Sequence, residues 1–291
     1  MLSGNLLWVL MGTMLLGIAA GITGTFSFLQ KQSLVGDAAA HAALPGIALA
    51  FLITGQKELP ILMIGAALTS ALSVYCIQWI VTYSKLKADA AIGLVLAVFF
   101  GIGIVLLTIV NRSPLGNQSG LNDFIFGKAA TMTKADLTWL FISAAIIIIV
   151  SLLLYKEWKL MIFDPVYAKG IGLPIEALKA CLTALIVMTI VTGIQAVGVI
   201  LMSALLIIPA ASAKLWTKKL NTMLLFSGIA GGLAGVAGTY ISSLRTGLST
   251  GPIIVLFAAS IFFLSYIFSP KSGQLSKYLR KKKFQQQGDV S

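Results

Sequence analysis

The chain has 291 residues, of which 58% are hydrophobic and only 10% are charged, and its mean hydropathy is +0.97. This composition excludes a soluble globular protein and predicts an all-α polytopic membrane protein. A formal net charge of +12 would suggest a nucleic-acid partner for a soluble protein, but in a membrane protein it reflects basic cytoplasmic loops. No nucleic-acid partner is therefore expected.

Apolar segments long enough to cross a bilayer, about 20 residues each, recur along most of the chain. The sequence predicts nine spanning helices, at 6–29, 33–54, 59–82, 88–110, 136–155, 175–194, 197–213, 221–241 and 252–268. We expect one transmembrane domain over 1–270, with the first segment retained as a helix and not removed as a signal peptide. The basic tail, 271–291, is expected to be cytoplasmic and either disordered or in contact with anionic lipid.

Basic residues predict which side of the membrane each helix end faces. With the N-terminus outside, five lysines and arginines fall in external segments: Lys57, Arg112, Lys128, Lys134 and Arg245. The other sixteen of the 21 fall in inner segments and the tail. Because positive charge accumulates on the cytoplasmic side, we expect an external N-terminus and a cytoplasmic C-terminus, as an odd number of helices requires.

The second predicted helix carries an unusual polar pair in the run SLVGDAAAHAALPG, residues 33–46. Asp37 and His41, the only histidine in the chain, are four residues apart, so a helix places both on one face. A helix that begins near Gln30 places them about 10 to 16 Å along its axis, near the middle of a ~30 Å hydrocarbon core. Pro45 follows one turn later and is expected to weaken the helix.

Two interpretations of this pair remain open. Ionisable side chains at membrane depth are costly and usually functional, and a carboxylate with an imidazole suits a divalent transition metal or a proton relay. Alternatively, Asp37 and His41 pair with each other or fix helix packing through hydrogen bonds. The spacing is compatible with both.

Two further stretches indicate helix contacts outside this pair. The external run LNDFIFGKAA, 121–130, is amphipathic enough for a short interfacial helix that either contacts a partner or caps the bundle. In the predicted helix 221–241, Gly228, Gly232 and their neighbours form GxxxG spacings, which predict close packing within the protomer or with a second copy.

An inner loop contains FDPVYAKGIGLP, residues 163–174. Asp164 is a natural helix N-cap, Pro165 suits the first helical position, and Gly170 or Gly172 can end the helix. The short helix is either a docking knob at the membrane surface or an ordinary loop helix.

Together these motifs resemble the permease subunits of bacterial ABC importers for manganese, zinc and iron. The resemblance is carried, in order, by KQSLVGDAAAHAALPGIAL (31–49), KADAAIG (87–93), DFIFG (123–127), FDPVYAKGIGLP (163–174) and QAVGVILMSALLIIPAASA (195–213). One departure is Ala40, where serine is frequent in the family; it removes a hydroxyl next to His41.

The resemblance implies a type II importer fold, similar to the vitamin B12 permeases, in the bacterial cell membrane. Expected partners are a second copy, two cytoplasmic ATP-binding subunits, an external metal-binding lipoprotein and membrane lipid. Asp37 and His41 would contact the metal. The implied ATPase-coupling helix comprises Asp164, Pro165, Val166, Tyr167, Ala168, Lys169, Gly170 and Gly172.

The implied cargo is a transported divalent ion: Mn²⁺ is favoured because no thiolate is near the pair, and Zn²⁺ and Fe²⁺ are the alternatives. No permanently bound cofactor is expected. One acid and one imidazole are too few for such an ion, but two copies about a two-fold axis supply two of each. The chain lacks the GxxxxGK[ST] phosphate loop, so we expect a permease and not an enzyme. The alternatives are a proton-coupled secondary transporter, or the same fold carrying a metal chelate.

Overall fold

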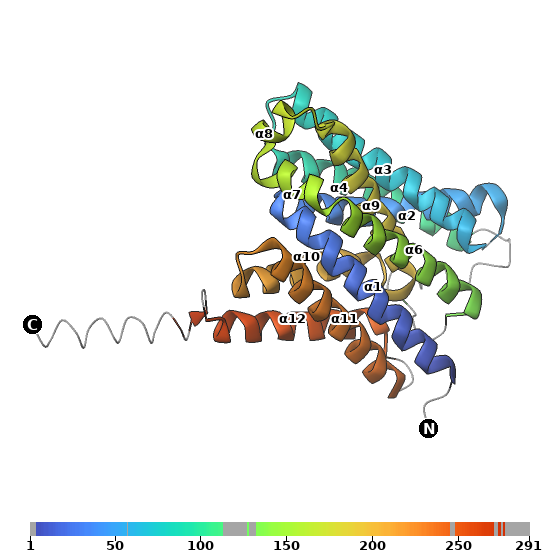
Figure 1. The fold of residues 1–291 in the computed structure, drawn as a ribbon. Helices are drawn as coiled ribbons and strands as arrows, with labels where there is room; N and C mark the ends of the chain where they lie inside the picture. Colours follow the sequence, from blue (N-terminus) through green and yellow to red (C-terminus); the bar gives the residue numbers. More distant parts are fainter. Residues whose placement is uncertain are drawn as a thin grey trace, which may run out of the picture.

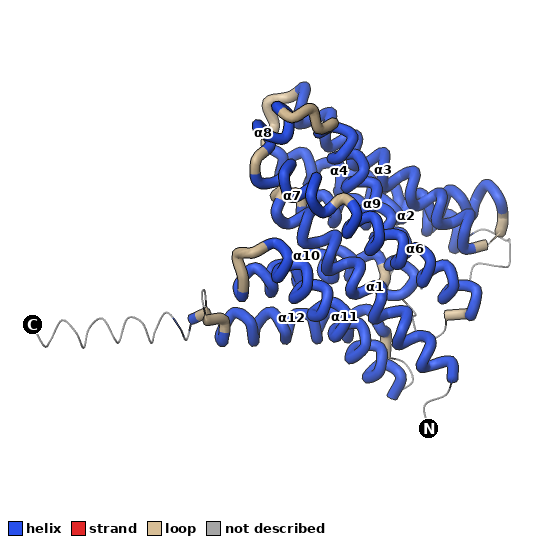
Figure 2. The backbone as a smooth tube through the Cα atoms, in the orientation of Figure 1, coloured by secondary structure: helices blue, strands red, loops and turns tan. Residues whose placement is uncertain are grey.

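The computed structural model describes residues 4–56, 58–112, 127, 132–244, 248–270, 273, 274 and 276. Within these residues the protein is built from helices and no strand occurs (Figures 1 and 2). The long helices are α1 (Gly4–Leu29), α2 (Ser33–Thr54), α3 (Leu59–Tyr83), α4 (Ala88–Arg112), α6 (Lys134–Leu153), α9 (Ile175–Val197), α10 (Val199–Trp216), α11 (Leu220–Leu244) and α12 (Thr250–Phe268). Each coincides with one of the nine predicted spanning segments.

Eight of the described helices are long and apolar enough to cross a membrane, and the apolar part of α10, Met202–Trp216, is shorter. The predicted segment at 197–213 is likewise shorter than the roughly 20 residues that a helix usually needs to span a bilayer. Gly198 alone joins α9 to α10, with φ 92° and ψ 159°. That backbone conformation is essentially restricted to glycine. The short apolar part of α10 thus begins close to the sharp turn at Gly198.

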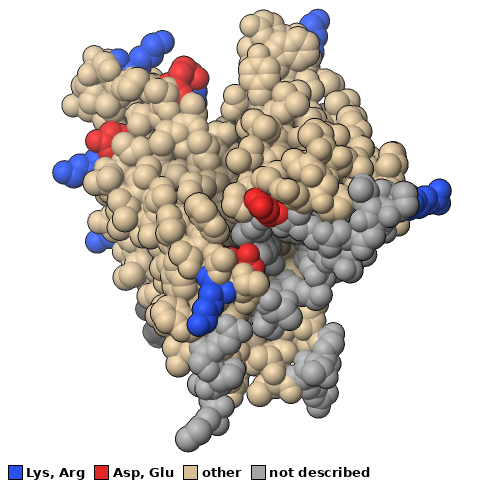
Figure 3. Space-filling model, turned by 90° about the vertical axis from the view of Figure 1, so that its right-hand side faces the viewer, with Lys and Arg blue, Asp and Glu red and all other residues tan. Residues whose placement is uncertain are grey.

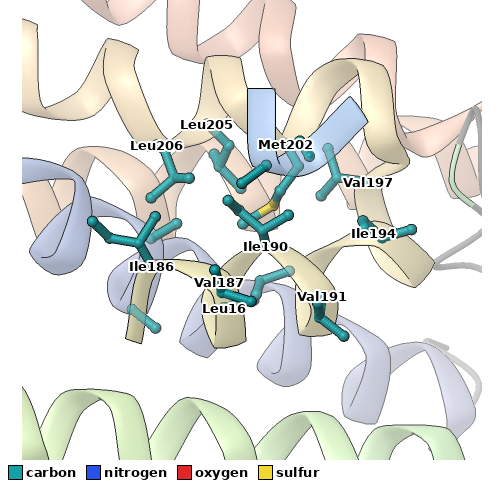
Figure 4. Close-up of a cluster of buried hydrophobic side chains, with 14 of the residues drawn as sticks. Leu16, Ile186, Val187, Ile190, Val191, Ile194, Val197, Met202, Leu205 and Leu206 are labelled. Carbon is teal, nitrogen blue, oxygen red and sulfur yellow. The ribbon is translucent and has the colours of Figure 1, made fainter. Parts of the chain in front are cut away.

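The core lies where α1, α9 and α10 meet. Leu16 of α1, Ile190 of α9 and Leu205 of α10 are almost completely buried, and their side chains converge in Figure 4. Small residues bring α1 against α11 on another side, because a methyl group on Gly17 would collide with the backbone of Gly231. The GxxxG stripe thus packs within the protomer.

The sequence analysis missed one helix, α7 (Tyr155–Phe163), and treated this stretch as loop. α6 ends at Leu153, and the chain resumes as α7 after a break at Leu154. Trp158 fixes α7 to the bundle and is fully buried. Its Nε1–H donates a hydrogen bond of 3.2 Å to the Leu178 carbonyl, and the centroid of its ring lies 5.0 Å from that of Phe26. The sequence feature that could have indicated α7 is Trp158, a large apolar residue between Lys156 and Lys159 in a short amphipathic segment.

Two predicted segments fall largely outside the described residues. They are the interfacial helix at 121–130, of which only Gly127 is described, and the tail at 271–291. Both stay predictions, as does the division of the chain at residue 270.

Candidate functional site

The helix that carries the polar pair is surrounded by other helices. α2 packs against α3, α4, α9 and α10, and Figure 1 shows its position relative to these helices. Glycines permit this packing: Gly46 lies against Gly65 of α3, and Gly103 of α4 lies against Pro45. In addition, Ser70 of α3 donates a hydrogen bond of 2.7 Å to a backbone carbonyl of α2. These contacts hold α2 in place within the bundle. The helix is not interrupted at Pro45 and continues to Thr54.

The structure brings Asp37 and His41 together on one face of α2, as the spacing predicted. Asp37 Oδ1 lies 3.6 Å from His41 Nε2, and the side chains are 31% and 17% exposed. This separation is longer than a hydrogen bond. Because α2 begins at Ser33, the two residues lie only about 6 and 12 Å along the helix. They are thus nearer its first end than a start at Gln30 would place them.

Besides Asp37, the His41 side chain has a neighbour that the sequence did not indicate. Its ring lies edge-on to Phe100 of α4, with centroids 5.0 Å apart and planes at 82°. The other ring nitrogen, Nδ1, is buried and has no hydrogen-bond partner among the described residues. Phe100 is remote in sequence and apolar, so no local signal pointed to it.

The pair lies on the part of α2 between its contacts with α4 and with α10. Gly36, which precedes Asp37, lies close to Leu206 of α10, and His41 contacts α4 through Phe100. α4 and α10 themselves scarcely touch. Asp37 and His41 are therefore partly accessible between α4 and α10 even though α2 is surrounded.

One copy of the chain does not complete a metal site in the part that the structure describes. No group of three or more His, Cys, Asp and Glu side chains gathers there. The two free cysteines, Cys76 and Cys181, are each partly buried in different helices. Asp37 and His41 of a single copy therefore offer two potential ligands, fewer than the four that a protein site for a divalent transition metal usually has.

The predicted short helix is present as α8 (Pro165–Gly170), directly after α7. The Asp164 carboxylate accepts a hydrogen bond from the Tyr167 backbone N–H at 3.0 Å, which confirms the N-cap. Pro165 occupies the first turn, and Gly172, at φ 81°, follows the helix end. Val166 is 82% exposed and Tyr167 is also exposed, whereas Ala168 is buried. The helix therefore presents an apolar tip.

Helices long and apolar enough to cross a membrane thus pack around a partly buried acid–imidazole pair, an arrangement typical of membrane transport proteins. Residues 3–269 match the ABC 3 transport family, and the chain belongs to that family. This membership confirms the resemblance that the sequence motifs indicated.

Two similar proteins are named for metal transport. The manganese transport system membrane protein MntC of Bacillus subtilis is 49% identical over 276 residues, which are 95% of this chain and 63% of the relative, so the chain spans less than two thirds of it. The zinc transport system membrane protein TroC of Treponema pallidum is 42% identical over 275 residues, which are 94% of this chain and 92% of the relative.

Solved structures confirm the permease fold. "PsaBC from Streptococcus pneumoniae in complex with Fab" matches with a TM-score of 0.83 and 32% identity over 97% of this chain and 96% of that chain. A putative metal-chelate type ABC transporter in an inward-facing conformation matches with a TM-score of 0.70 and 17% identity over 89% of this chain and 84% of that chain, which supports the fold alone.

Proposed function

We propose that the chain is the membrane permease of an ABC importer that carries a divalent transition metal ion into the cytoplasm. Mn²⁺ is the preferred cargo and Zn²⁺ is the second. The single observation that carries this proposal is the pair Asp37 and His41, held 3.6 Å apart on an otherwise apolar helix. The relatives named for manganese and zinc transport support it.

The spacing of the pair suits two ligands of one ion. Ligand atoms about 2.1 Å from a tetrahedral ion lie about 3.4 Å from each other, and those of an octahedral ion about 3.0 Å. The 3.6 Å between Asp37 Oδ1 and His41 Nε2 needs only a small side-chain movement to reach either value. Both side chains keep some exposure, so an ion can reach them.

A second copy would complete the site. Two copies about a two-fold axis would place two carboxylates and two imidazoles around the ion. Four ligands from oxygen and nitrogen, without thiolate, favour Mn²⁺ slightly over Zn²⁺. A site on a transport pathway must also release its ion. A small number of ligands keeps binding weak enough for that release.

Energy would come from separate subunits. Two cytoplasmic ATPases would bind α8, whose apolar tip includes Val166 and Tyr167, and an external lipoprotein would deliver the ion. In this arrangement the N-terminus is outside and the tail is inside. Family membership favours this importer over a proton-coupled secondary transporter. The small alanines beside Asp37 favour a bare ion over a metal chelate.

Metal uptake tests the proposal. In cells that express the full importer, Asp37→Ala and His41→Ala should reduce accumulation of Mn²⁺ or Zn²⁺ to the level of cells without the permease, because each removes two ligands from a four-ligand site. Asp89→Ala, which removes an exposed acid in the first turn of α4, is the matched control and should transport normally. Permease recovered in membranes, and ATPase recovered with it, should be equal in all strains. Normal uptake by the His41→Ala strain would refute the role of that residue.

A further inference from the structure

A long groove opens on the side of the molecule formed by α3, α6 and α9, with the start of α2 at one end. Its volume is about 1330 Å³, larger than the roughly 300–1,000 Å³ of a small-molecule pocket. The surface is visibly hollowed between two lobes in Figure 3. The middle of the groove is lined by apolar side chains, among them Val74, Ile77, Ala184 and Val187.

One end of the groove is polar and carries a cation. Lys31, Gln32, Gln78, Glu176 and Lys179 line it. Lys179 Nζ is neutralised by Glu176 Oε1 at 2.9 Å, whereas Lys31 has no acidic partner among the described residues. A net positive charge therefore remains at this end.

The backbone holds Lys31 in place. It adopts φ 59° in the turn between α1 and α2, and its N–H donates to the Phe28 carbonyl at 3.1 Å. The next residue, Gln32, donates its N–H to the Ser27 carbonyl at 3.0 Å. The base of the side chain is thus fixed, and its ammonium group can reach the groove mouth.

The groove lies away from the Asp37–His41 face. Val35 lines the groove, and at about 100° per residue Asp37 and His41 lie roughly 160° and 120° around α2 from it. A second copy that contacted this one only at the Asp37–His41 face would therefore leave the groove open. α3 and α6 form opposite walls without packing closely against each other, so the space between them is available to another molecule.

We propose that this groove binds one anionic phospholipid per copy, with an acyl chain along the apolar lining and the phosphate at Lys31. Basic pockets between transmembrane helices are where anionic headgroups bind. The apolar lining suits an acyl chain, and the uncompensated charge of Lys31 suits a headgroup with net negative charge. The lipid would bridge α3 to α9 and α6.

Native mass spectrometry tests this proposal on the full chain purified with its partners. The protein is exchanged into mixed micelles of phosphatidylglycerol and phosphatidylcholine at equal concentration. Wild type should retain phosphatidylglycerol in preference, and Lys31→Gln should reduce that preference about fivefold, since one lysine near a membrane surface contributes about that factor. Lys85→Gln, which changes an exposed lysine outside the groove, is the matched control and should behave as wild type.

A second variant tests the acyl-chain part of the site. Ala184→Phe places a ring in the groove and should lower retention of both lipids, while metal uptake reports separately that the protein is folded. Equal retention by wild type and Lys31→Gln, or no preference between the two lipids in wild type, would overturn the proposal. So would a disulfide between two copies of an Ala184→Cys variant, because a second copy would then occupy the groove.

Discussion

At the scale of single residues, His41 depends on a side chain that its own helix does not provide. Metal-binding histidines usually fix their orientation by donating the other ring N–H to a neighbour. Here Nδ1 has no such partner among the described residues, and the imidazole instead forms a T-shaped pair with the ring of Phe100. We infer that Phe100 is a positioning residue for the imidazole.

Removing this ring should weaken transport without abolishing it. An edge-to-face aromatic pair contributes about 0.5–1.5 kcal/mol, so Phe100→Ala should reduce metal uptake at limiting metal about two- to tenfold. Phe100→Tyr retains the ring and should restore uptake, and Val98→Ala, an exposed position on the same helix, should have no effect. If Phe100→Ala transports as wild type does, or if Phe100→Tyr is as defective as Phe100→Ala, the positioning role is wrong.

Sequence reasoning found Asp37 and His41 because both lie on one helix, where spacing determines their common face. Phe100 could not be found this way, because its contact with His41 depends on how α4 crosses α2. The distance of the pair from the start of its helix was overestimated, because a turn at Lys31 precedes α2, which begins at Ser33 and not near Gln30.

At the scale of elements, α7 and α8 form a compact unit at one end of the bundle. Trp158 ties α7 to the carbonyl of Leu178 in α9, and the Asp164 cap fixes the start of α8. These contacts connect the exposed tip of α8 to α9, a helix that packs against α2, and we expect a movement of α8 to be passed to α9. This is the connection that a coupling helix requires.

A charge at the tip of α8 should separate the permease from its ATPase. Val166→Asp places a carboxylate at the most exposed apolar position of α8, and burying it in a subunit interface without a partner is costly. We expect at least about a tenfold loss of ATPase recovered with the tagged permease. Leu86→Asp, an exposed residue between α3 and α4, is the matched control and should recover ATPase normally. Equal ATPase recovery from both variants would rule out α8 as the docking helix.

The elements show where sequence patterns stop being informative. The GxxxG spacings predicted a close contact but not that its partner is α1, because the same stripe fits a helix of another copy equally well. Asp164 and Pro165 predicted α8 because caps are local. α7 was missed because its lysines resemble a solvated loop, and only its packing shows that Trp158 is buried.

At the scale of the whole molecule, the proposed site is shared between two copies. Each copy would contribute Asp37 and His41. The groove at Lys31 and Val35 lies on a different face of α2, and α8, the proposed contact for the ATPases, lies at one end of the bundle. The three proposed functions of ion passage, lipid contact and ATPase coupling would thus involve different parts of the molecule, connected through α2 and α9.

The central claim is that two Asp37–His41 pairs bind one ion together, and the coordination of bound Mn²⁺ tests it most directly. In the purified homodimer, pulsed electron paramagnetic resonance should show one Mn²⁺ per two copies with nitrogen couplings from two imidazoles. His41→Ala should lose those couplings. One Mn²⁺ per copy, each with a single imidazole, or Mn²⁺ without any nitrogen ligand, would contradict a site shared across the dimer.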